Sequence, residues 1–85
     1  MDMLTIPAPT QTDIMTTARR VMPGDILLDR QGVPIALVTR ARTRLTGRRV
    51  TRIEGEWLLS RPLGSSNVFR RTTMATTATA IRREI

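Results

Sequence analysis

The sequence contains no histidine, lysine, cysteine or tyrosine, and its aromatic side chains are limited to Trp57 and Phe69. Without histidine and lysine, the chain lacks side chains that commonly carry acid–base or nucleophilic chemistry near pH 7. Without cysteine, it can form neither a disulfide framework nor a thiolate zinc site. These absences predict a protein that is not an enzyme and that uses no metal or other cofactor.

All fourteen basic residues are arginines, and with seven acidic residues they give a formal net charge of +7. Residues 1–17 hold Asp2 and Asp13 and no arginine, whereas residues 18–85 hold all the arginines and five acidic residues, a net charge of +9. The guanidinium group is planar, permanently charged and suited to phosphate and carboxylate. A GC-rich coding bias also favours arginine over lysine, but it does not explain the net charge. The charge therefore predicts an acidic partner.

The chain length of 85 residues allows one small domain, which buries roughly 60–65% of its unfolded surface in a small aliphatic core. The N-terminal residues lack the basic and apolar regions of a secretory signal, and no apolar run approaches the roughly 18–20 residues of a membrane-spanning helix. We therefore expect a cytoplasmic protein without membrane contact, located in the host cytoplasm if a phage encodes it.

The N-terminal residues 1–12 contain two prolines and a threonine-rich stretch without apolar periodicity. This composition predicts a flexible arm ahead of a folded domain at residues 13–85. Residues 13–22 fit either a strand or a short helix that Asp13 would cap and Pro23 would end. Both assignments stay open on the sequence alone.

The clearest pattern in the chain is a two-residue alternation from Val33 to Leu45. Odd positions hold apolar residues or threonine, and the later even positions hold Arg40, Arg42 and Arg44. A period of two is typical of a strand with one buried and one solvated face. The pattern predicts a long strand whose odd-numbered side chains face inward and whose arginines face solvent.

Turn residues divide the flanking sequence into further short strands. A glycine-containing turn at residues 29–32 predicts a hairpin between residues 26–28 and the long strand. The acid–glycine pair Glu54-Gly55 predicts a tight hairpin between strands at residues 49–53 and 56–61. Each of these strands is short enough to belong to a small sheet.

The C-terminal residues 72–85 fit two structures. The spacing of their apolar side chains fits a helix, whereas their five threonines favour a strand. We favour a closing strand near residues 76–83. Short strands joined by glycine turns then predict an all-β fold, a small, partly open barrel of five or six strands.

The run Val21-Met22-Pro23-Gly24-Asp25-Ile26, the glycine hairpin after it and the strand at residues 34–40 resemble the opening of small Src-homology-type β-barrels. These include KOW-like modules and short phage and bacterial reading frames. The resemblance implies a β-barrel fold and, from the KOW-like members, a tendency to contact nucleic acid or ribonucleoprotein. It transfers no functional residue to this chain.

Residues 40–52 carry six arginines and no acidic residue, which predicts a ladder of like charges on paired strands. Such charges repel one another, so an anion such as the phosphate backbone of DNA or RNA would offset them. The other interpretation is a solvated face that Glu54 and Glu56 partly neutralise. Trp57 and Phe69 are expected in the core and not as platforms for base stacking.

The sequence therefore predicts a non-enzymatic, arginine-rich module that binds the phosphate backbone of nucleic acid. The alternative is a phage-type accessory or assembly protein that docks on an acidic protein surface, and an oligomer is compatible with both. The predicted nucleic-acid-binding residues are Arg40, Arg42, Arg44, Arg48, Arg49 and Arg52, with Arg70 and Arg71 as secondary contacts.

Overall fold

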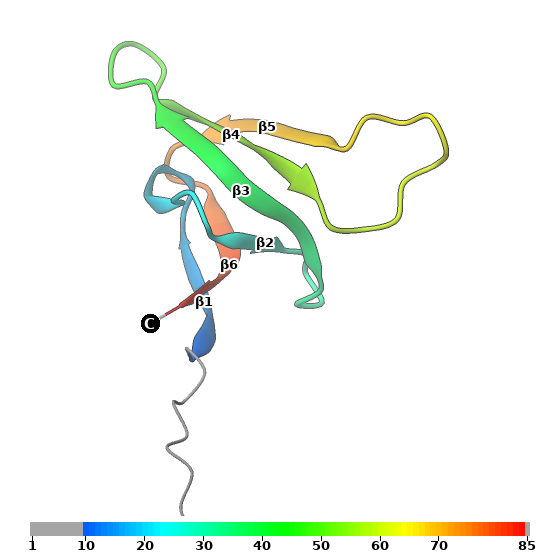
Figure 1. Cartoon of the computed structure of the whole chain (residues 1–85). Helices are drawn as coiled ribbons and strands as arrows, with labels where there is room; N and C mark the ends of the chain where they lie inside the picture. The colour runs from blue at the N-terminus through cyan, green and yellow to red at the C-terminus, as the bar shows by residue number, and fades with distance from the viewer. Residues whose placement is uncertain (1–9, 85) are drawn as a thin grey trace, which may run out of the picture.

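The computed structural model describes residues 10–84 of the chain (Figure 1). The elements are β1 (Gln11–Thr17), the 3-10 turn η1 (Ala18–Arg20), β2 (Ile26–Leu28), β3 (Pro34–Thr43), β4 (Val50–Trp57), β5 (Val68–Met74) and β6 (Ala78–Glu84). The predicted all-β class with five or six strands is confirmed. Over the described range, no helix has the length and apolar character needed to cross a membrane.

All six strands belong to one antiparallel sheet in the order β1-β6-β2-β3-β4-β5. Within residues 10–84, the edge strands β1 and β5 do not pair with each other, so the sheet is not closed into a barrel. In Figure 1, β3, β4 and β5 extend across the upper part of the molecule, and the β1–β6 pair lies below them. The core cluster consists of Val21, Leu27, Ala36, Val38, Ile53, Phe69 and Ile81.

The two aromatic rings belong to this core, as the sequence predicted. Phe69 is buried, and the half-buried Trp57 packs against the same cluster. Their ring centroids are 5.0 Å apart in an edge-to-face arrangement, which adds about 0.5–1.5 kcal/mol beyond the buried area. The pair joins β4 to β5 on the core side of the sheet.

The hairpin between β2 and β3 is confirmed, and its turn is held by Asp29. The Oδ1 atom of Asp29 accepts hydrogen bonds from the backbone N–H groups of Gln31 (2.8 Å) and Val33 (2.9 Å). Gly32 has a φ of +80°, a conformation that a side chain would strain. The turn therefore uses a carboxylate to satisfy backbone donors and a glycine to reverse the chain.

A β-bulge interrupts β3 where it pairs with β4. Val38 lies opposite Gly55, but the next pair is Arg40 with Glu54, so Thr39 is an extra residue on β3. An extra residue on one strand breaks the two-residue period and moves the following side chains to the other face. The bulge therefore separates β3 into two halves with opposite orientation.

The two halves of β3 bury different positions. Before the bulge the even-numbered Ala36 and Val38 are fully buried, and after it the half-buried side chains are the odd-numbered Ala41 and Thr43. The prediction that odd positions face inward is wrong before the bulge and correct after it. The prediction that the arginines of this strand face solvent is correct.

The predicted hairpin at Glu54-Gly55 is wrong, because both residues lie inside β4, which continues to Trp57. Gly55 is buried between β3 and β5, and a Cβ atom there would overlap the carbonyl oxygen of Leu37. The glycine is needed for the close approach of the two backbones at the bulge and not for a turn.

Both ends of the described chain form paired strands. The helix considered for residues 13–22 is absent, since β1 runs to Thr17 and only η1 follows it, whereas the predicted C-terminal strand is confirmed as β6. Gln11 and Thr12 pair with β6, so the sheet begins inside the predicted arm. Residues 1–9 of that arm lie outside the described residues.

A buried carboxylate ties the Pro23-Gly24 turn to β6. Asp25 is 2% exposed, and its side chain accepts hydrogen bonds from the Met22 N–H (2.8 Å) and from the Arg83 guanidinium (2.7 and 2.8 Å). The hydrogen bonds to Asp25 raise the pKa of Arg83. The sequence around Pro23-Gly24-Asp25 gave no sign of this ion pair, because its partner is 58 residues away.

An exposed pair of the same kind joins β1 to β6. Arg82 donates two hydrogen bonds to the Asp13 carboxylate, at 2.6 and 3.1 Å. These hydrogen bonds hold the pKa of Asp13 below its ordinary value. The two neighbouring arginines of β6 therefore have acidic partners in different surroundings, one buried and one in water.

Gly55→Ala should lower the free energy of unfolding by about 3 kcal/mol, because the added Cβ would collide with the backbone of β3. Gly47→Ala is the matched control, since Gly47 has a φ of +65° but no atom within 4 Å of its Cβ position, and it should cost about 1 kcal/mol. Urea unfolding followed by Trp57 fluorescence measures both. Equal losses would contradict the role assigned to Gly55.

Asp25→Asn should lower the free energy of unfolding by about 2 kcal/mol, because the buried site loses hydrogen bonds to a charged group. Asp13→Asn should have a much smaller effect, because solvent screens the exposed pair. The same unfolding assay compares the two variants. A larger loss of unfolding free energy in the Asp13 variant would contradict the greater contribution assigned to the buried Asp25 pair.

The acid dependence of stability provides the second readout of these variants. Because its folded-state pKa is lowered, Asp13 stabilises the fold above its unfolded-state pKa, and this contribution is lost as the pH falls through the folded-state value. Unfolding of the Asp13→Asn variant should therefore depend less on pH in the acid range than unfolding of the wild type does.

Candidate functional site

The outward surface of β3, β4 and β5 collects arginines from three strands. Directly opposed residues of antiparallel strands point to the same side of a sheet, so the pairing places these side chains together. We call this surface the arginine face, and it consists of Arg40 and Arg42 on β3, Arg52 and Glu54 on β4, and Arg70 on β5. Its four arginines are exposed, and with Glu54 they carry a formal net charge of +3. The exposed Glu56, the next outward residue of β4, lies one row further along the same side and partly offsets this charge.

Two rows of side chains cross the arginine face. In the first row, Glu54 lies between Arg40 and Arg70, and in the second, Arg42 lies directly opposite Arg52. The Nε atom of Arg52 is 3.0 Å from Oε1 of Glu54. Within residues 10–84, Glu54 is the only acidic residue that forms an ion pair on this face. The second row therefore contains no acidic residue of its own, and Glu54 of the first row neutralises it only in part.

The arginine face is hollowed between these rows. A hollow of about 140 Å³ is lined by Arg40, Arg42, Arg52 and Glu54. A larger open hollow of about 640 Å³ continues toward the end of the β3–β4 hairpin and is lined by Arg42, Thr43, Arg44, Val50, Arg52 and Thr72. An anion in the smaller hollow can accept charge-assisted hydrogen bonds from three guanidinium groups. This arrangement of guanidinium groups is therefore chemically suited to anions.

The loop that joins β3 to β4 extends the positive charge beyond the sheet. This hairpin tip comprises residues 44–49, contains Arg44, Arg48 and Arg49, and projects from the molecule in Figure 1, where it is green. All its side chains are exposed, including Leu45 at 76%. The structure thus brings seven of the eight predicted binding arginines to one continuous region.

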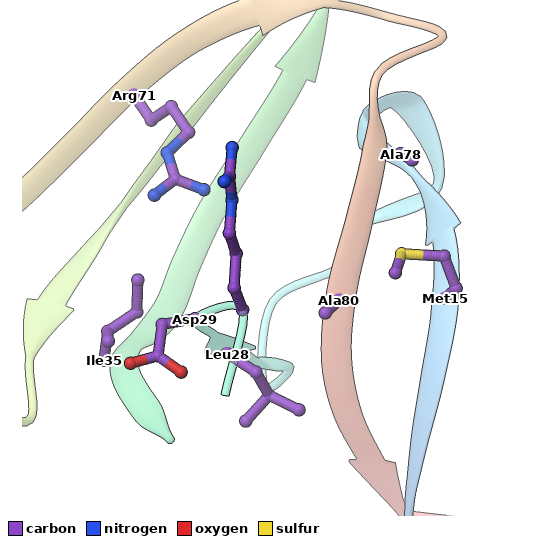
Figure 2. A pocket seen from close by; sticks show the side chains of 8 residues that line it. Met15, Leu28, Asp29, Ile35, Arg71, Ala78 and Ala80 are labelled. Carbon is purple, nitrogen blue, oxygen red and sulfur yellow. The ribbon is translucent and has the colours of Figure 1, made fainter. Parts of the chain in front are cut away.

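Arg71 lies apart from this region. It is opposite the buried Ile53, whereas its neighbour Arg70 points to the arginine face, because successive strand residues alternate. Its guanidinium is 5.2 Å from the centre of the Phe69 ring. Figure 2 shows Arg71 extending from β5 toward a hollow of about 410 Å³, which is lined by Met15, Leu28, Asp29, Arg30, Ile35, Arg71, Ala78 and Ala80. The sequence did not foresee this separation of two adjacent arginines.

The loop between β4 and β5 corrects the predicted strand at residues 56–61. β4 ends at Trp57, and the chain then leaves the sheet until Val68. The loop exposes three large apolar side chains, Leu58, Leu59 and Leu63. No local signal in the sequence showed that Leu58 and Leu59 lie beyond the end of β4.

No group of three or more acidic side chains that could hold a metal ion occurs over residues 10–84. A scan against protein-family models, a search of curated proteins and a search of solved structures each found no match. The resemblance of the chain opening to KOW-like β-barrels therefore stays a prediction.

Arg42→Gln should raise the free energy of unfolding by roughly 0.2–0.5 kcal/mol at low salt, because it removes the repulsion between directly opposed charges. The gain should vanish near 1 M salt, where the Debye length falls to about 3 Å. Arg30→Gln is the matched control, since Arg30 is an exposed arginine of the β2–β3 turn. A loss of stability at low salt in the Arg42 variant alone would show that Arg42 makes a favourable contact.

Proposed function

We propose that this protein binds the phosphate backbone of nucleic acid through the arginine face and the hairpin tip. The observation that carries the proposal is the hollow that Arg40, Arg42 and Arg52 surround, with Glu54 as its acidic member. A guanidinium fork donates paired hydrogen bonds to phosphate oxygens. Bound phosphate would also relieve the repulsion between Arg42 and Arg52.

The sheet gives these guanidinium groups a regular spacing. Same-face residues of one strand are separated by roughly 6.6 Å, so Arg40, Arg42 and Arg44 form a row along β3 that continues into the hairpin tip. Pairing with β4 holds this row in register with Arg52. A rigid row of charges suits a regularly charged polymer better than a single small anion.

Binding of this kind does not depend on base sequence. Contacts to phosphate position a protein on nucleic acid but carry no direct sequence information. Each neutralised phosphate of a duplex releases counterions and contributes a slope of about −0.9 to the dependence of log K on log salt. Glu54 competes with phosphate for Arg52, so it limits the affinity of the face.

A second candidate function is docking on an acidic protein as an assembly or accessory factor. The exposed Leu58, Leu59 and Leu63 in the β4–β5 loop favour it, because grouped apolar side chains on a surface mark protein interfaces. In that case the arginine face would meet carboxylates of one specific partner. Binding would then require the leucines and would yield a defined stoichiometry.

The Arg40→Gln/Arg42→Gln double variant should weaken binding to mixed-sequence DNA and RNA and flatten the salt slope by up to about 1.8 for a duplex. The matched control is Arg30→Gln/Arg71→Gln, which removes the same charge away from the arginine face. Glu54→Gln should have the opposite effect and tighten binding, because it frees Arg52. Fluorescence anisotropy over a salt series measures all four proteins.

Equal weakening by the two double variants would show that only net charge matters and would contradict the proposed site. A wild type that binds no nucleic acid at low salt would overturn the function and favour the acidic protein partner. That partner is then sought by pull-down with the wild type, and loss of one stoichiometric protein in a Leu59→Ser/Leu63→Ser variant would identify the loop as its docking element.

A further inference from the structure

We propose that the ligand is double-stranded DNA and that the hairpin tip, residues 44–49, enters its major groove while the arginine face lies on the adjoining phosphates. This inference rests on the proposed function and names the ligand class. Three features of the described residues carry it: the location of the aromatic rings, the construction of the hairpin and the composition of its tip.

The aromatic rings offer little free surface to unpaired bases. Proteins that bind single strands stack bases on exposed aromatic side chains. Here Phe69 is buried, and the half-buried Trp57 packs edge-to-face against it at the border of an open hollow that Arg61 and Arg70 also line. The guanidinium groups of Arg61 and Arg71 lie over them, at 4.6 and 5.2 Å from the ring centres. The arginine face thus offers charges without stacking platforms, which suits a duplex whose bases are already stacked.

The hairpin remains paired up to the start of its tip. The hydroxyl groups of Thr43 and Thr51 are 2.8 Å apart, and the N–H of Arg44 donates to the carbonyl of Val50 at 2.8 Å. Gly47, with a φ of +65°, allows the loop to reverse. On the other side of β4, Val50 pairs with Met74 of β5 and the Arg49 carbonyl accepts a hydrogen bond from the Ala75 N–H at 3.1 Å. Only the turn at residues 44–49 therefore projects beyond the sheet (Figure 1). The major groove of B-form DNA admits elements as wide as a two-stranded β-ribbon and so has room for this turn, whereas the major groove of A-form RNA is too deep and narrow.

The side chains of the tip match the chemistry of that groove. Arg44, Arg48 and Arg49 offer donors to the acceptor atoms of guanine and to the phosphates at the groove edges. Leu45, which is largely exposed, offers an apolar surface to thymine methyl groups. The tip therefore has groove-directed contacts that the arginine face lacks.

The test compares single-stranded DNA, duplex DNA and duplex RNA of one sequence at one salt concentration. We expect the wild type to bind duplex DNA at least about tenfold more tightly than the other two. Arg48→Gln/Arg49→Gln should abolish most of this preference, whereas Arg40→Gln/Arg42→Gln should weaken binding to all three ligands. The Arg30→Gln/Arg71→Gln protein is again the charge-matched control.

Dimethyl sulfate footprinting on the saturated duplex distinguishes the grooves, because it modifies guanine N7 in the major groove and adenine N3 in the minor groove. Protection of N7 that is lost in the Arg48→Gln/Arg49→Gln protein supports the inference. Protection of adenine N3 alone would overturn it, as would equal affinity for single strands or duplex RNA. These outcomes leave the proposed function intact, whereas absence of binding to all three ligands would overturn both.

Discussion

The close approach of β3 and β4 at Gly55 is the constraint on which the arrangement of this sheet depends. The extra residue Thr39 directly follows Val38, which lies opposite Gly55, and a Cβ at Gly55 would overlap the β3 backbone. Because of the bulge, the even-numbered side chains of β3 point to the core up to Val38 and to solvent from Arg40 onward. The first half of the strand thereby contributes to the core, and the second half displays its arginines. A regular strand with this sequence would place Arg40 and Val38 on the same face.

The arginine face exists because neighbouring strands add to the same surface in register. Arg52 and Arg70 lie next to the arginines of β3, although they are distant in sequence. The direct opposition of Arg42 and Arg52 is unfavourable for folding because their like charges repel. A surface that retains such repulsion is better suited to an anionic ligand than to solvent, and Glu54 offsets the repulsion only in part. Under the proposed function, these charges lower the stability of the fold and raise its affinity for the anionic ligand.

Strands β1, β2 and β6 complete the sheet that carries the arginine face. β6 receives β1 on one side and β2 on the other, and the Asp25–Arg83 pair fixes the chain entering β2 to β6. The core-facing pair Trp57 and Phe69 fills the space under β4 and β5. Since the rings are used in packing, the outward surface is left to charged side chains. Because the rings lie in the interior and the charges on the exterior, the arginine face is better suited to phosphate groups than to base stacking.

Local sequence patterns determined the all-β class, the β2–β3 hairpin and the exposure of the arginines on β3, because side-chain period and turn residues act over a few neighbouring positions. They also predicted the C-terminal strand β6, because the threonine content favoured a strand over the helix that the apolar spacing allowed. The same patterns were wrong at Glu54-Gly55, because an acid–glycine pair looks alike in a turn and at a close approach of strands. The phase of the β3 alternation, the choice of Arg70 and not Arg71 for the arginine face, and the partner of Asp25 were decided by tertiary structure alone. Each depends on which strand lies alongside, and pairing between residues far apart in the chain leaves no local signal.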